Sequence, residues 1–123
     1  MTGWLIYDKK QYKKNKWFAE GILKNCSAFC EMKLLFAEEL IFGSDEKGTF
    51  FEHPAKPISA PDFAVNRSIF PLLSLILEKS GTRVFNSYET SSLCNDKRKT
   101  YLAVAGSRIP IMKTAFFKKS FFE

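Results

Sequence analysis

Polar side chains that could bind an anionic ligand follow three short apolar runs, each of which has the character of a β-strand. Asp8 follows the first run, Asn66-Arg67 the second and Asn86-Ser87 the third. Open parallel sheets bind their ligands outside the carboxyl ends of the strands. The planar guanidinium of Arg67 suits a carboxylate or a phosphate. We therefore predict Asn66 and Arg67 as substrate-binding residues, with local capping or a local salt bridge as the alternative role for Arg67.

No group of side chains predicts a catalytic nucleophile or a metal site. His53 is the only histidine and stands beside Pro54 in a stretch typical of a surface loop. Cys26 and Cys30 lie four residues apart and could share a metal, but only Cys94 and His53 remain to complete the ligand set and no CxxC pair is present. Because both cysteines fall in apolar helical rows, packing is the favoured role. We assign no catalytic residue and no metal ligand.

Two common nucleotide-binding motifs are absent from the sequence. Neither GxGxxG nor GxxxxGK[ST] occurs, so neither a dinucleotide-binding domain of the usual kind nor a P-loop nucleotidase is indicated.

The first 36 residues have the pattern of a strand, a helix and a second strand. Residues 3–7 form a short apolar run, typical of a strand buried on both faces. Apolar residues recur at helical spacing from about Asn15 to Phe29, after a lysine-rich loop and helix entry at residues 9–16. Residues 32–36 form the second strand. This βαβ unit requires parallel pairing of its strands and a right-handed crossover.

The middle of the chain predicts a hairpin followed by a second strand–helix–strand unit. Residues 40–42 and 49–51 flank a long polar tip, and three prolines then stiffen an extended stretch. Residues 63–65 and 83–85 are predicted as further parallel strands. The helix between them begins at Pro71 and ends at Gly81.

The last part of the chain predicts two helices and a strand. Asn86, with Glu89 three residues later, can cap a short helix. Asn95 or Asp96 can cap a second helix that runs to about Ala105. Residues 113–117 are predicted as a strand. The phenylalanines at 116, 117, 121 and 122 must dock on the domain, meet a partner or belong to a longer protein, so homo-oligomerisation is possible.

These elements together predict an α/β fold with three α/β/α layers, an open and mainly parallel Rossmann-like sheet, and a β-hairpin insertion. The 123 residues suit one domain, and 46% hydrophobic with 26% charged residues is globular composition. The longest apolar stretch is far shorter than the ~20 residues of a membrane span. Three cysteines and no secretory leader favour a reduced, cytoplasmic protein with no membrane association.

The net charge of +6 is spread unevenly along the chain. Residues 1–33 carry seven basic and three acidic side chains, and residues 96–123 carry seven basic and two acidic ones. The segment between them carries five basic and eight acidic side chains. Basic ends favour a nucleic acid, a phosphate or another anion as ligand, while solvated helix faces are the simpler explanation.

The order of five short motifs resembles the ATP-grasp ligases of the RimK-like α-L-glutamate ligase branch. The motifs are Pro61-Asp62-Phe63-Ala64-Val65-Asn66-Arg67, Gly81-Thr82-Arg83-Val84-Phe85-Asn86-Ser87, Asp96-Lys97, Ile109-Pro110 and Lys113-Thr114. Each motif alone is weakly specific, but their order and gaps match the family over about residues 3–117. Met112 departs from the proline that is common before the Lys-Thr pair, which affects the local loop only.

The resemblance implies that residues 1–95 form a pre-ATP-grasp domain and that residues 96–123 are the helix and first strand leading into a truncated ATP-grasp domain. It also implies that Lys97 contacts ATP, with an exposed surface lysine as the alternative. The magnesium ligands and the rest of the nucleotide site would lie beyond Glu123, in the remaining ATP-grasp domain of the same chain. ATP and Mg²⁺ would thus serve the full-length ligase, which joins a small-molecule or peptide carboxylate to an amine through an acylphosphate, and this part alone would not be catalytic.

Two other functions remain open from the sequence. The chain could be a stand-alone α/β module that binds an anionic ligand or a nucleic acid through its basic ends. A less favoured possibility is an enzyme that uses Cys26, Cys30 and His53 as thiol or metal groups.

Overall fold

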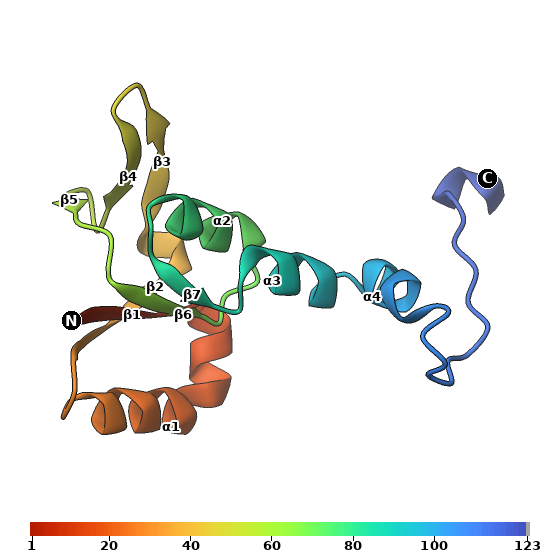
Figure 1. The fold of residues 1–123 in the computed structure, drawn as a ribbon, viewed down its shortest axis with the longest axis horizontal. Coiled ribbons are helices and arrows are strands. Elements are labelled where there is room, and N and C mark those ends of the chain that lie inside the picture. Colours follow the sequence, from red (N-terminus) through yellow and green to blue (C-terminus); the bar gives the residue numbers. More distant parts are fainter. Residues whose placement is uncertain (123) are drawn as a thin grey trace.

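The computed structural model describes residues 1–122, with side chains through Phe121, and shows a mixed α/β protein with two sheets (Figure 1). The larger sheet has four parallel strands in the order β2-β1-β6-β7. Their bounds are β1 Thr2–Tyr7, β2 Glu31–Phe36, β6 Phe63–Asn66 and β7 Arg83–Phe85. The four parallel strands predicted from the apolar runs are confirmed.

The strand order reverses between β1 and β6. The chain steps from β1 outward to β2 and then returns to the other side of β1 to form β6 and β7. In open α/β sheets, ligands bind at the carboxyl edge where the order reverses. Asp8 and Arg67 directly follow the two strands at this point.

Helix α1 (Lys9–Cys26) connects β1 to β2 and is longer at its start than the sequence pattern predicted. Residues 9–16 were predicted as a loop and helix entry, and the loop part of this prediction is wrong, because the helix begins at Lys9. Lysine is a good helix former, and the Glu38 carboxylate accepts hydrogen bonds from the backbone N–H of Lys9 at 2.9 and 3.1 Å. A kink at Asn15 (φ −121°, ψ 20°) separates this first part from the rest of the helix.

The parallel sheet has an apolar cluster on each face, because successive strand side chains point to opposite sides. On one face, Leu5 and Tyr7 pack against Ala19 of α1. On the other face, the cluster under helix α2 (Pro71–Lys79) includes Trp4, Ile6, Ala64, Leu73 and Leu77. Helices α1 and α2 therefore cover opposite faces, as Figure 1 shows.

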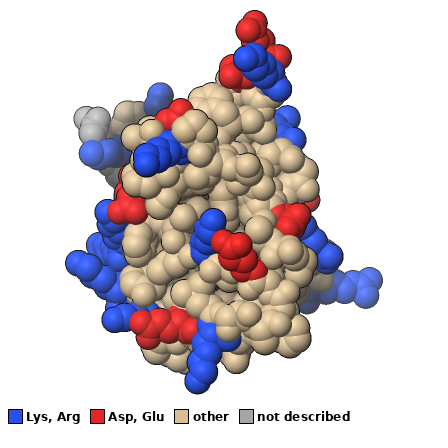
Figure 2. All heavy atoms as spheres, turned by 90° about the vertical axis from the view of Figure 1, so that its left-hand side faces the viewer, with Lys and Arg blue, Asp and Glu red and all other residues tan. Residues whose placement is uncertain are grey.

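The predicted hairpin is present and belongs to a separate antiparallel sheet of β3 (Ile41–Asp45), β4 (Gly48–Glu52) and β5 (Pro57–Ile58). It follows a 3₁₀ turn at Ala37–Glu39. Its tip is shorter than predicted, because the strands extend to Asp45 and Gly48 and the Asp45 carboxylate accepts from the Lys47 N–H at 2.8 Å. The charged tip projects from the top of the molecule (Figure 2). An edge-to-face contact of Phe51 with Trp4 at 5.5 Å joins the hairpin to the core.

The last part of the chain leaves the sheet. Helices α3 (Tyr88–Cys94) and α4 (Lys97–Val104) lead to a segment that extends away from the rest of the molecule and ends in a 3₁₀ turn at Lys119–Phe122 (Figure 1). The predicted strand at residues 113–117 is wrong, since this stretch has no regular secondary structure. It lies apart from both sheets, so no strand edge is beside it to pair with its backbone.

The phenylalanines of this segment do not dock into either core. Phe117 is 63% and Phe121 76% exposed, and their rings lie 6.3 Å apart. Phe122 lies outside the described side chains. Among the helices of residues 1–122, none combines the length and apolar character needed to cross a bilayer.

Candidate ligand pocket at the carboxyl edge of the sheet

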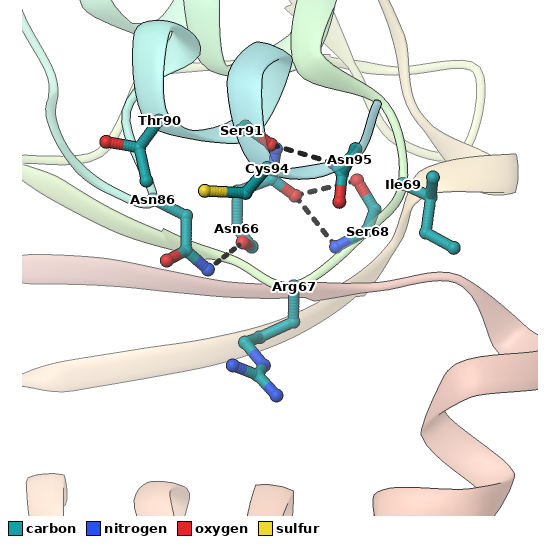
Figure 3. Close-up of a pocket in the computed structure, with 9 residues that line it drawn as sticks. All are labelled: Asn66, Arg67, Ser68, Ile69, Asn86, Thr90, Ser91, Cys94 and Asn95. Carbon is teal, nitrogen blue, oxygen red and sulfur yellow. Dashed lines mark hydrogen bonds between the residues drawn. The ribbon is translucent and has the colours of Figure 1, made fainter. Parts of the chain in front are cut away.

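A pocket of about 280 Å³ opens where β6 and β7 end and α3 begins (Figure 3). Amides and hydroxyls dominate its lining, which comprises Asn66, Ser68, Asn86, Thr90, Ser91 and Asn95 together with Arg67, Ile69 and Cys94. Such a lining can donate and accept several hydrogen bonds without carrying a charge. The pocket therefore suits a polar ligand held mainly by neutral groups.

The side chain of Asn66 forms the central hydrogen bonds in the floor of this pocket. Its side-chain oxygen accepts from the backbone N–H of Ser68 at 3.0 Å and from the Ser68 hydroxyl at 2.7 Å. Its amide nitrogen donates to the Ser74 hydroxyl of α2 at 2.9 Å. Asn66 is only 1% exposed. It thus fixes the β6 loop against α2 and serves as a positioning residue.

Asn86 joins the ends of β6 and β7. Its backbone is left-handed (φ 64°), and its amide donates to the carbonyl oxygen of Asn66 at 2.8 Å. The prediction that Asn86 caps the next helix is wrong, because its side chain is used across the sheet. Ser87 caps α3 instead, accepting from the Thr90 N–H at 3.2 Å.

Arg67 follows Asn66 directly but points to the other side. Its side chain is directed away from the other lining residues (Figure 3). The guanidinium lies over the Phe18 ring of α1, 5.7 Å from the ring centre. Among residues 1–122 it pairs with no carboxylate. The guanidinium is exposed and so accessible to an anionic group approaching from the α1 side.

Two carboxylates, one after β1 and one after β2, already accept hydrogen bonds from backbone N–H groups at the carboxyl ends of β6 and β1. Asp8 accepts from the Ile69 N–H at 2.7 Å, and Glu38 accepts from the Lys9 N–H at the start of α1. A helix N-terminus attracts anions, and at α1 Glu38 fills this position. A phosphate would have to displace it, so the polar pocket beside β6 and β7 is the better candidate.

A small charged cluster lies beside the hairpin. The Lys9 ammonium pairs with Glu39 at 2.6 Å, which lowers the pKa of Glu39 and raises that of Lys9. His53 lies 3.5 Å from the other Glu39 oxygen. Cys26 and Cys30 precede β2 at the opposite edge of the sheet, so the structure does not bring them together with His53. Within residues 1–122 no group of three potential metal-ligating side chains occurs.

Lys97 lies just beyond the pocket. It is the first residue of α4, it is exposed, and it follows the pocket residue Asn95 by two positions. Its neighbour Arg98 is engaged with Asp96 through contacts of 2.9 and 2.7 Å. Asp96 also caps α4 by accepting from the Arg98 N–H at 3.0 Å, so it is Asp96 that fulfils the predicted capping role.

The Asp96–Arg98 pair gives a testable pH dependence. Hydrogen bonding to Arg98 lowers the pKa of Asp96 from 3.8 to about 2. Its capping contact should therefore be fully present above pH 3.8 and be lost as the pH falls through about 2. We expect an NMR titration of the Asp96 carboxyl carbon to show a midpoint near 2, and Arg98→Gln to move it back toward 3.8. A midpoint that Arg98→Gln leaves unchanged would contradict this assignment.

Comparison with models of known protein families finds no match to this chain. A search of curated proteins likewise finds no matching relative. The fold and the pocket thus define the class: an α/β protein with a four-stranded parallel sheet and a neutral polar pocket at its carboxyl edge.

Proposed function

We propose that this chain is the amino-terminal, three-layered and Rossmann-like domain of an ATP-dependent carboxylate–amine ligase. One observation carries the proposal: two of the five motifs that resemble the glutamate ligases meet at one edge of the sheet, and the third follows them after one short helix. Asn66-Arg67 ends β6, Asn86-Ser87 follows β7, and Asp96-Lys97 begins α4. The hydrogen bond from Asn86 to the Asn66 carbonyl connects the first two motifs at the pocket.

In this proposal the described residues bind and position, and the chemistry takes place between this domain and the rest of the ligase. Lys97 contacts the phosphates of ATP, which its exposed ammonium on α4 fits. Arg67 binds a carboxylate of the substrate from the α1 side, and Asn66 keeps the β6 loop in place. ATP supplies the phosphoryl group that activates the carboxylate before the amine displaces it.

Mg²⁺ is not assigned to these residues, because the described part of the chain offers no cluster of ligating side chains. Its ligands would be in the remaining ATP-grasp domain, as the family resemblance implies. The proposal places residues 1–95 in the amino-terminal domain and the segment from residue 96 at the start of the next domain. This 123-residue chain alone should therefore not turn over ATP.

The test compares the 123-residue chain with the protein made from the longest open reading frame that contains it. ADP release is measured with ATP, Mg²⁺, glutamate or glutamyl peptides as the carboxylate, and an amine. We expect release that requires both co-substrates from the longer protein and none from the short chain. Lys97→Ala should lower kcat/KM by about 10- to 100-fold, the value of one charge-assisted contact, while Lys99→Ala on the same helix should have little effect.

Arg67→Ala serves as a second variant. It should lower kcat/KM with little change in the melting temperature, because its exposed guanidinium makes no ion pair among residues 1–122. An equal loss of activity and stability would assign Arg67 a structural role. Absence of ADP release under every substrate combination would contradict the ligase proposal itself.

A further inference from the structure

One flank of α1 carries an apolar groove that the sheet does not fill. The groove has a volume of about 380 Å³ and is lined by Trp17, Phe18, Gly21, Ile22, Asn25 and Cys26. Trp17 is 77% and Phe18 40% exposed, and their rings meet edge to face at 5.8 Å. A large aromatic pair on the solvent side of a helix indicates an interaction surface.

The helix that carries this groove is strongly basic. Helix α1 contains six lysines and a single acidic residue, Glu20, which pairs with Lys16 at 3.6 Å. The lysines at 10, 13, 14 and 24 are exposed and form no ion pair within residues 1–122. Basic side chains appear along the lower margin of Figure 2, at the height of α1 in Figure 1, with acidic ones between them. An occupant of the groove should therefore be anionic.

We propose that this surface binds single-stranded nucleic acid, a function independent of the ligase proposal. Trp17 offers its indole face to a base, and stacking of this kind tolerates any sequence. Gly21 lies one turn further along the helix and has no side chain. The space beside its Cα is open, since a Cβ at this position would have no neighbour within 4 Å. Asn25, another turn on, presents an exposed amide that can bond a base edge. The exposed lysines of α1 contact the phosphates on either side.

The surroundings of the aromatic pair favour a nucleic acid over a lipid surface. Arg67 lies over the Phe18 ring at 5.7 Å, and Asn25 lines the same groove. Insertion of Trp17 and Phe18 into hydrocarbon would desolvate both polar groups without a partner. A stacked base leaves them in water or bonded to the ligand. Because Arg67 lies over the Phe18 ring, Trp17, which is 77% exposed, is the ring available for stacking.

The experiment measures binding of the full chain to a fluorescein-labelled dT oligonucleotide and, separately, quenching of tryptophan emission. Trp4 is 4% exposed, so quenching by the bases reports Trp17. The dissociation constant should rise with salt with a log–log slope of about 3, as expected for four lysine–phosphate contacts on a single strand. Trp17→Ala should weaken binding about tenfold or more.

Gly21→Leu tests the role of the groove without destabilising the fold. Leucine is a better helix former than glycine and the position is open, so the variant should fold at least as well while its side chain fills the groove and weakens binding about tenfold or more. The matched controls are Phe29→Ala, another exposed aromatic (81%), and Lys47→Ala on the hairpin, which should both bind as the parent chain does. Binding that Trp17→Ala and Gly21→Leu leave unchanged would overturn the proposal. Binding to phosphatidylserine vesicles with none to the oligonucleotide would overturn it as well.

Discussion

Replacing Asn66 with alanine should lower the free energy of unfolding by about 3 kcal/mol and open the pocket at the carboxyl edge. The change removes the acceptor of the Ser68 N–H and the donor to the Ser74 hydroxyl. Both serines are buried, at 4% and 0% exposure. The N–H and the hydroxyl of Ser68 lose their acceptor, and each buried polar group left without a partner costs about 1–3 kcal/mol, whereas the Ser74 hydroxyl still donates to the Asn86 carbonyl. Urea unfolding followed by circular dichroism measures the loss.

Asn95→Ala is the matched control for this prediction. Asn95 lines the same pocket but makes one side-chain hydrogen bond of 3.2 Å, to the Ser91 hydroxyl. Its replacement should cost about 1 kcal/mol or less. Equal effects of the two variants would show that Asn66 does not organise the pocket.

Replacing Leu73 with alanine should lower the free energy of unfolding by about 3 kcal/mol, because it leaves a cavity between α2 and the sheet. Leu73 is fully buried in the cluster that also contains Trp4, Ile6 and Ala64. The neighbouring Leu72 on the same helix is 51% exposed. Leu72→Ala should cost about 0.5 kcal/mol, as is usual at the surface. Similar losses at both positions in urea unfolding would contradict the packing of α2 described above.

The parallel strands could be predicted because local pattern decides them. Residues 3–7 form an apolar run, and the structure buries all of them. Such a short run, ended by a polar residue, is typical of a parallel strand covered on both faces. Residues 83–85 were predicted with the bounds that β7 has. These elements require no knowledge of distant residues.

The helix starts at α1 and α3 could not be predicted, because distant residues determine both. Glu38 caps α1 through the Lys9 N–H, although it lies 29 residues away along the chain. Asn86 is drawn to the Asn66 carbonyl, which leaves the capping of α3 to Ser87. A capping pattern read along the sequence detects neighbours only three or four residues apart.

The candidate site was predicted in part. The sequence located Asn66 and Arg67 at the end of a strand, and both contribute to the pocket lining. The sequence did not show that the two side chains point in different directions. Asn66 is hydrogen-bonded in the floor of the pocket, whereas Arg67 lies over Phe18 on the α1 side. Thr90, Ser91 and Asn95 were missed as lining residues. Only the packing of α3 against α2 brings them to the pocket, and no local sequence pattern predicts that packing.

The strand predicted at residues 113–117 failed for a different reason. Its apolar residues are typical of a strand, but a strand also needs a neighbouring edge for its backbone hydrogen bonds. In the described part of the chain this segment lies beyond α4, away from both sheets (Figure 1). Composition alone therefore cannot decide its structure.

Oxygen transfer from the carboxylate substrate to phosphate is the most direct test of the proposed ligase. If ATP activates a carboxylate as an acylphosphate and an amine then displaces the phosphate, one carboxylate oxygen must leave with the phosphate. With ¹⁸O-labelled glutamate or glutamyl peptide as the acid and the longer protein as the enzyme, mass spectrometry should find one ¹⁸O in each phosphate released. Phosphate without ¹⁸O, or release of AMP and pyrophosphate in place of ADP, would contradict the account.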